Sequence, residues 1–323
     1  MPQLFKNNSN SFNTNNSFNT TYINPTFADD RPNILAWLSP LNAKLRHQDI
    51  RDRRVGNIGG WVLQTEEFRS WSANSGGGES DNSFLFCYGD PGVGKTFIRY
   101  NNTNELLRME ENGQVLTSRD VSSLVIDNLC SQAREQNATV ACFYFDFAAQ
   151  NEQCPTTMLG CLLKQLVFGL NEIPEEISEA YEESKNAIGG QGPQISNILN
   201  MLQTASSRRR TFICIDALDE CAAEHRAKLL DSLGQLQQSP GTRIFVTGRP
   251  HILPEIRKNL AGGVTSLSIS PKRDDIVTYL RSRLAADTTP DAGDSNLEAD
   301  ILKKIPRDIS EMYVGAATFR KLP

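Results

Sequence analysis

The chain has 323 residues, 39% of them hydrophobic, which is enough to form one large folded domain or two smaller ones. Its formal net charge of -5 argues against nucleic acid as a constant partner, because neutralising phosphates requires a basic face. No apolar run approaches the roughly 18 residues of a membrane span, and no secretory signal pattern opens the chain. We therefore expect a cytoplasmic protein that does not bind membranes.

The amino-terminal third contains a polar tail followed by two helical patterns. Residues 1–30 are dominated by Asn, Ser and Thr with isolated Phe, and such a segment cannot bury enough apolar surface to fold, so it is predicted to be disordered. Within residues 31–78, apolar side chains recur at helical spacing from Ile34 to Leu45 and again from Trp61 to Trp71. These segments are predicted to be flanking helices beside a core at residues 79–270.

Five short apolar runs separated by helical segments follow. Such alternation predicts an α/β fold with a five-stranded, mainly parallel sheet sandwiched by helices. The predicted strands are Ser83–Tyr88, Thr139–Phe147, Thr211–Ile215, Arg243–Thr247 and Val264–Ile269. The predicted helices between them cover residues 158–167, 173–187 and 195–202, and two more are expected at 271–285 and 296–305. The seven cysteines include no C-x-x-C pair and are expected to be reduced core residues.

The first predicted strand leads into Gly89–Thr96, which satisfies the pattern G-x-x-x-x-G-K-[S/T] of a phosphate-binding loop. Backbone N–H groups of such a loop cradle phosphates, its Lys adds positive charge, and its hydroxyl binds Mg²⁺. Our candidate nucleotide-binding residues are Gly89, Gly92, Val93, Gly94, Lys95 and Thr96, with Thr96 also a metal ligand. The alternative is a glycine-rich turn that contains Lys-Thr by chance, and the predicted strand directly before the loop argues against it.

Three acidic residues and one arginine complete the candidate site. Asp216 ends a strand, where its carboxylate would emerge at the edge at which parallel sheets bind ligands, and it is our second candidate for Mg²⁺. Asp219 or Glu220 could orient or deprotonate an attacking water, although both could instead be acids that complement a helix dipole. Arg249 follows the fourth strand and could reach a terminal phosphate, or it could be an ordinary surface residue.

At this point the chain resembles a known family, the NACHT-type STAND nucleotide-binding domains in their nephrocystin-like amino-terminal form, found in fungal ankyrin and WD-repeat receptors. The motifs that carry the resemblance are GDPGVGKT at 89–96, TFICIDALDEC at 211–221, FVTGRP at 245–250, WLSPL at 37–41 and GWVL at 60–63. The resemblance covers residues 35–285. It implies a switch operated by ATP, or sometimes GTP, with slow hydrolysis, in which Arg249 is the sensor and Asp216, Asp219 and Glu220 form an extended Walker B signature.

The sequence departs from the family at two places. The family continues into a winged helix and a repeat array, whereas here residues 271–323 are expected to be only the start of a helical lid region, and no internal repeat is visible. In addition, the polar segment Tyr100–Ser122 interrupts the helix expected after the loop. Deleting it joins Arg99 to Ser123 and restores the helical period. We hypothesise that this segment is a translated retained intron, and the alternative is a genuine surface insertion.

Two functions of different classes remain open from the sequence. The first is a Mg²⁺-nucleotide switch whose protein partners, or further copies of itself, would bind through the missing flanking domains. The second is a non-hydrolysing interaction module, or a truncated fragment, that retains the fold without activity. An active ring-forming motor is disfavoured, because we find no second arginine motif that could act across a ring.

Overall fold

A computed structural model describes residues 30–73, 83–89, 118–187, 192–260, 262–270, 272–286 and 295–319. The chain divides into Met1–Asp30 and Arg31–Pro323, and the second unit contains the folded core. Residues 1–29 of the predicted disordered tail lie outside the described residues, as do Asp90–Thr96 of the phosphate loop and Tyr100–Thr117 of the proposed insertion.

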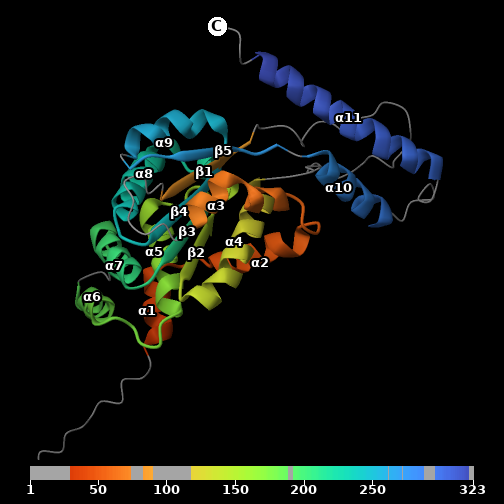
Figure 1. The fold of residues 1–323 in the computed structure, drawn as a ribbon. Coiled ribbons are helices and arrows are strands. Elements are labelled where there is room, and N and C mark those ends of the chain that lie inside the picture. Colours follow the sequence, from red (N-terminus) through yellow and green to blue (C-terminus); the bar gives the residue numbers. More distant parts are fainter. Residues whose placement is uncertain are drawn as a thin grey trace, which may run out of the picture. The chain divides into compact units, whose positions relative to one another are not determined.

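The core is a five-stranded sheet in the order β2-β3-β4-β1-β5 (Figure 1). All the paired neighbours are parallel, so the expected α/β fold is confirmed, with a sheet that is wholly rather than mainly parallel. The strands are β1 (Phe84–Tyr88), β2 (Thr139–Tyr144), β3 (Thr211–Asp216), β4 (Thr242–Gly248) and β5 (Thr265–Ser268). The side chains of β3 and β4 are buried along their entire length, as continuous apolar strands covered on both faces should be.

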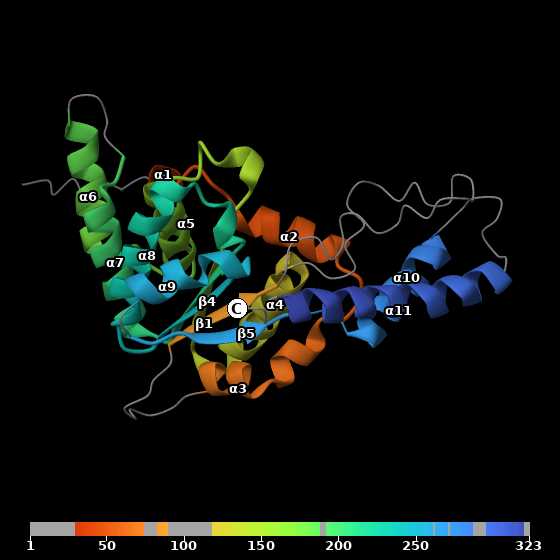
Figure 2. The same cartoon turned by 90° about the horizontal axis from the view of Figure 1, so that it is seen from above.

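Helices cover both faces of this sheet (Figure 2). One face is covered by α3 (Glu66–Ser72) and α4 (Ser118–Gln136), and the other by α5 (Pro155–Phe168) and α8 (Ala223–Gln237). The helix α4 contains the last residues of the segment that we hypothesised to be inserted. Among them Val121 and Ser122 are buried, so the carboxyl end of that segment is part of the packed core.

Two flanking helices, α1 (Arg31–Leu38) and α2 (Ala43–Arg53), pack against this core. Pro40 separates them, whereas the sequence pattern ran through it. The turn between them docks on α5, where the Ser39 hydroxyl donates to the Thr157 carbonyl at 2.9 Å and Lys164 donates to the Ser39 carbonyl at 2.9 Å. Gly160 permits this approach, because a Cβ there would lie 2.0 Å from the Leu38 carbonyl oxygen.

The carboxyl-terminal helices α10 (Arg273–Ala286) and α11 (Ser295–Phe319) form a satellite hydrophobic cluster with the turn at Val55–Ile58. The short helix η1 (Gly60–Gln64) supplies a polar link to α10. There the indole N–H of Trp61 donates to Asp275 Oδ2 at 3.0 Å, and the Gly59 N–H lies 3.3 Å from Oδ1. Thus the GWVL motif joins the amino-terminal flank to α10.

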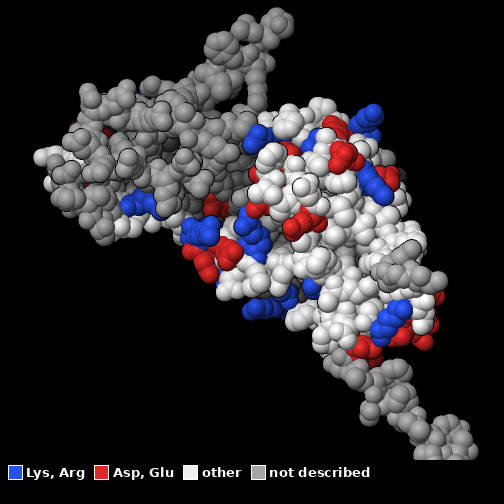
Figure 3. Space-filling view, turned by 180° about the vertical axis from the view of Figure 1, so that it is seen from behind, with Lys and Arg blue, Asp and Glu red and all other residues white. Residues whose placement is uncertain are grey.

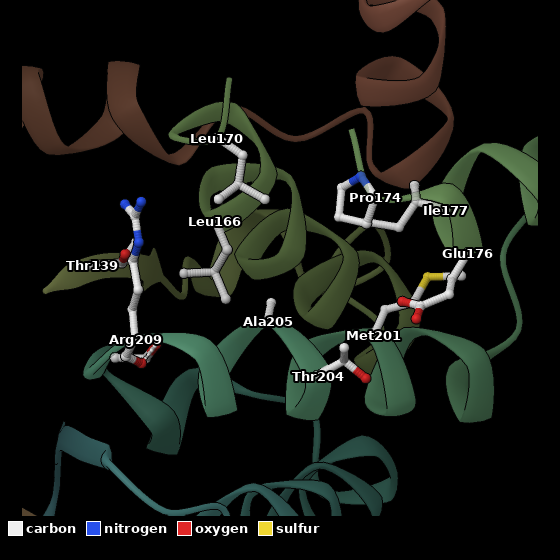
Figure 4. A pocket seen from close by; sticks show the side chains of 11 residues that line it. Thr139, Leu166, Leu170, Pro174, Glu176, Ile177, Met201, Thr204, Ala205 and Arg209 are labelled. Atoms are coloured by element: carbon white, nitrogen blue, oxygen red, sulfur yellow. Dashed lines mark hydrogen bonds between the residues drawn. The ribbon is translucent and has the colours of Figure 1, made fainter. Parts of the chain in front are cut away.

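The remaining helices are α6 (Glu175–Asn186), α7 (Ile195–Arg208) and α9 (Leu253–Asn259). A pocket of about 320 Å³ opens between α5, α6 and α7, with Leu166 and Met201 on its walls and Thr139 and Thr211 at the amino ends of β2 and β3 (Figure 4). It therefore lies at the edge of the sheet opposite the predicted site. Among the described helices, none has both the length and the apolar character required to cross a membrane.

The seven cysteines are all free thiols, as expected. Five of them are buried, but Cys130 is exposed and Cys154 is intermediate, so these two are not core residues. Cys130 belongs to α4, and Cys154 is the N-cap residue of α5.

Candidate functional site

The carboxyl ends of β1, β4 and β3 are adjacent, and the predicted polar residues follow them. The strand β4 lies between the other two, with Tyr88 of β1 opposite Gly248 of β4. Neighbouring strands are about 4.8 Å apart, so the ends of β1 and β3 are separated by about 10 Å. This order brings Gly89, Arg249 and Asp216 to one edge of the sheet, although they are far apart in sequence.

Asp216 is buried, with 1% of its surface exposed, and two hydroxyl groups donate to it. Ser122 Oγ of α4 and Thr247 Oγ1 of β4 each lie 2.6 Å from Asp216 Oδ1. Short hydrogen bonds to a carboxylate are among the stronger ones in proteins, and together these two fix the rotamer of Asp216. The carboxylate is therefore held between the helix and the neighbouring strand, at the end of β3.

The chain turns sharply immediately after Asp216. Ala217 has φ of 53° and ψ of 49°, a left-handed conformation that costs a non-glycine residue about 1–2 kcal/mol. Its N–H donates to Thr247 Oγ1 at 3.0 Å, so the hydroxyl that holds Asp216 also holds the turn. Backbone strain of this kind is concentrated at functional sites, and here it directs the short helix η3 (Leu218–Glu220) across the end of β4.

Asp219 and Arg249, two of the predicted site residues, form an ion pair. Arg249 Nε lies 3.1 Å from Asp219 Oδ2, and the Arg249 backbone N–H donates to Asp219 Oδ1 at 3.2 Å. The Asp219 side chain is 8% exposed, whereas that of Arg249 is 43% exposed and borders solvent. Gly248 makes room for this contact, because a Cβ there would lie 3.3 Å from Asp219 Oδ1 and 2.9 Å from Ile252.

Glu220 is directed toward a different neighbour. Its Oε2 accepts the Phe147 N–H at 3.2 Å, and its carbonyl accepts from Gln150 Nε2 at 2.6 Å. Both partners belong to the segment that follows β2. Glu220 therefore ties the segment that follows β2 to the end of β3.

The predicted phosphate-binding residues divide between described and undescribed parts of the chain. Gly89 directly follows β1, and its backbone passes so close to β5 that a Cβ would lie 3.1 Å from the Ile269 carbonyl oxygen. The other five, Gly92, Val93, Gly94, Lys95 and Thr96, lie outside the described residues. What is described fits Mg²⁺ and a phosphate: a fixed carboxylate, hydroxyl groups and a basic side chain at the edge where the loop begins.

Sequence reasoning missed two of the residues at this edge, Ser122 and Thr247. Thr247 lay within a predicted strand and could have been noticed as the polar residue in an otherwise apolar run, at the end facing Asp216. Ser122 lay in the segment thought to be inserted, and no local signal distinguished it from its neighbours. Its contact with Asp216 depends on the packing of α4 on the sheet.

The parallel order of the strands and the polar edge define this chain as a P-loop NTPase fold. More specifically, the chain belongs to the family described as Nephrocystin 3, N-terminal, whose model matches residues 57–118 and 120–249, more than half of the sequence. The nephrocystin-like resemblance is therefore confirmed. None of the curated proteins compared with the chain matches it.

Solved structures similar to this chain include the ORC1 protein of Aeropyrum pernix in complex with DNA, with 15% identity and a TM-score of 0.38. The match covers 90% of this chain and 65% of that one. A DNA replication initiation factor has 10% identity and a TM-score of 0.38, with 82% and 62% covered. A Walker-type ATPase of Pyrococcus abyssi has 12% identity and a TM-score of 0.43, with 80% and 69% covered. The chain thus spans slightly less than two thirds of the first two.

Proposed function

We propose that this chain is a nucleotide-operated switch of the NACHT and STAND type. The observation that carries the proposal is the fixed Asp216 carboxylate beside the Asp219–Arg249 pair, at the edge where Gly89 begins the G-x-x-x-x-G-K-T motif. In the proposed complex, Gly92, Gly94 and Lys95 hold the phosphates, and Thr96 and Asp216 hold Mg²⁺. The nucleotide is ATP or GTP, since none of the described contacts discriminates the base.

Arg249 is the proposed sensor of the terminal phosphate. Its guanidinium is 43% exposed and pairs with Asp219, so it can exchange one anionic partner for another by a change of rotamer. A terminal phosphate near the end of β1 would compete with Asp219 for that guanidinium. The conformation of η3 would then depend on which nucleotide is bound, and this differential interaction is what a switch requires.

Hydrolysis in this scheme is slow or absent. The carboxylate of Asp219 is occupied by Arg249, and Glu220 accepts a backbone N–H of the loop after β2. A general base must be within hydrogen-bonding reach of an attacking water, so either residue would first have to leave its partner. In this conformation these contacts favour a protein without turnover, which is also what the second candidate function, a non-hydrolysing interaction module, requires.

The partners that we propose besides nucleotide are other proteins or further copies of the chain. On the face shown in Figure 3, Lys and Arg side chains are interspersed with Asp and Glu among the described residues, rather than gathered into one basic area. A nucleic-acid partner would require a basic face, and because the formal net charge is -5 we propose none. We also propose no membrane partner and a cytoplasmic location.

A fluorescent nucleotide titration tests the proposed function. Wild type and Lys95→Ala are titrated with a fluorescent ATP analogue in the presence of Mg²⁺, and unlabelled ATP and GTP are then used to displace it. The proposal predicts saturable binding that Lys95→Ala weakens at least about tenfold, the equivalent of 1.4 kcal/mol. Equal binding by the two proteins would show that the loop does not hold the phosphates.

A further inference from the structure

The helix α2 contacts two elements that flank Asp216. It lies outside the strands and loops that carry the candidate residues, yet two of its neighbours are α4, which supplies Ser122, and β2, which pairs with β3. Its polar side chains point to both.

Arg54, directly after α2, joins it to α4. Arg54 Nη1 donates to Ser123 Oγ at 2.6 Å, and Nη2 donates to Asp127 Oδ2 at 2.9 Å. The Arg54 side chain is 13% exposed and Ser123 is fully buried, so these charge-assisted bonds are largely screened from water. Ser123 is the immediate neighbour of Ser122, and successive helical residues point in different directions. One serine therefore faces Arg54 while the next faces Asp216.

His47 joins α2 to the other side of the same site. His47 Nε2 lies 3.1 Å from Asp127 Oδ1, and Nδ1 lies 2.7 Å from the Tyr144 hydroxyl. Tyr144 ends β2 and is opposite Asp216 in the register of β2 and β3. With Asp127 accepting from Nε2–H, a neutral imidazole accepts the Tyr144 O–H at Nδ1, which satisfies all three groups.

We propose that Arg54 and His47 are positioning residues for the nucleotide site, which hold α4 and β2 so that the Ser122 hydroxyl reaches Asp216. This inference rests on the proposed function, in that Asp216 must contribute to metal binding for its position to affect affinity. The coupling passes through a rigid helix: Arg54 fixes Ser123 and Asp127, and α4 carries Ser122 to the sheet. Loss of the Arg54 contacts would let the first turns of α4 move away from β3.

The test compares nucleotide affinity with and without Mg²⁺, because a positioning role at Asp216 affects only the metal-dependent part. Arg54→Ala is measured beside Arg54→Lys, which retains the charge but not the paired geometry, and beside Arg53→Ala. Arg53 is the matched control, since it is exposed and belongs to the last turn of the same helix. We expect Arg54→Ala to reduce the gain in affinity from Mg²⁺ about fivefold or more, the lower end of typical couplings between sites. Arg54→Lys should restore part of it, and Arg53→Ala should not alter it.

The outcomes separate this inference from the proposed function. If wild type binds no nucleotide, or binds it without any gain from Mg²⁺, the proposed function and the inference that rests on it both fail. If wild type shows the gain and Arg54→Ala retains it fully, the proposed function stands and the positioning role is overturned.

Hydrogen exchange of the Ala217 amide gives a second readout that needs no nucleotide, because that N–H donates to Thr247 beside Asp216. We expect Arg54→Ala to accelerate this exchange more than that of amides in α8. Uniform acceleration of both would indicate general destabilisation and would contradict a specific positioning role.

Discussion

Replacing Thr247 by Val tests the description of the Asp216 site most sharply, because the two side chains have nearly the same shape. The substitution removes the hydroxyl that donates to Asp216 Oδ1 at 2.6 Å and accepts the Ala217 N–H at 3.0 Å. A hydrogen bond to a charged group contributes about 1.5–3 kcal/mol, and a buried N–H without a partner costs about 1–3 kcal/mol. Since Ser122 still donates to Asp216, we expect a net loss of about 2–5 kcal/mol in the free energy of unfolding.

The assay is urea denaturation followed by circular dichroism and by tryptophan fluorescence, so that coincidence of the two transitions checks two-state behaviour. Thr247→Ser is the control, because it retains the hydroxyl and removes one methyl group, at a cost of about 1 kcal/mol. If Thr247→Val proves as stable as Thr247→Ser, the hydroxyl does not hold the carboxylate and the turn as described.

Three further predictions concern packing, pH and the unusual segment. Gly160→Ala should lower the free energy of unfolding by about 1–3 kcal/mol, because its Cβ would lie 2.0 Å from the Leu38 carbonyl oxygen. Gly192→Ala is the control and should be nearly neutral, because no atom lies within 4 Å of the added Cβ. Thermal denaturation compares the two variants, and equal melting temperatures would refute the close approach at Gly160. Burial lowers the pKa of His47 from its usual value of 6.5, so the contribution of the neutral imidazole to stability is complete above pH 6.5 and is lost as the pH falls below it. Urea denaturation at pH values from 7.5 to 5 should show that the free energy of unfolding falls less steeply with decreasing pH in His47→Gln than in wild type. Equal pH dependence in the two proteins would contradict this. The charged and titratable groups that face this imidazole are Asp127, Tyr144, Arg51 and Arg54. Deleting residues 100–122 places Ile98 at the helical position of buried Val121 and replaces Ser122, which donates to Asp216, by Arg99. If the segment is a retained intron, the product should still fold and bind Mg²⁺-nucleotide, because the Thr247 hydroxyl still donates to Asp216; an unfolded product, or one that binds no nucleotide, would support a genuine insertion.

Most of the sheet could be predicted from the sequence because β1 to β4 are short, mainly apolar runs with polar or glycine residues at their ends, whereas β5 has Leu267 as its one apolar residue. The runs from Thr211 to Ile215 and from Arg243 to Thr247 are buried on both faces, so the strand shows in the sequence as a continuous, mainly apolar run rather than as an alternating pattern. The order of the strands could not be predicted in this way. No local pattern states that β4 lies between β1 and β3, and this order is what brings Arg249 next to Asp219.

The candidate site was predictable only where its residues lie in sequence motifs. Asp216, Asp219 and Arg249 could be chosen because each follows an apolar run, but the ion pair between the last two depends on the left-handed turn at Ala217. Glu220 shares the same motif, yet it contacts the segment after β2 because η3 directs it away from Asp216. Side chains that act from covering helices, such as Ser122 and Arg54, give no signal until the packing is known.

The affinity for ATP with and without Mg²⁺, measured for wild type and for Asp216→Asn, tests the central claim most directly. Asn keeps the size of the side chain and removes the negative charge that would attract the metal. The account predicts that Mg²⁺ strengthens binding to wild type at least about tenfold and has little effect on the variant, with similar metal-free affinities in both. A variant that gains as much from Mg²⁺ as wild type would contradict a metal-binding role for Asp216, and with it the proposed switch.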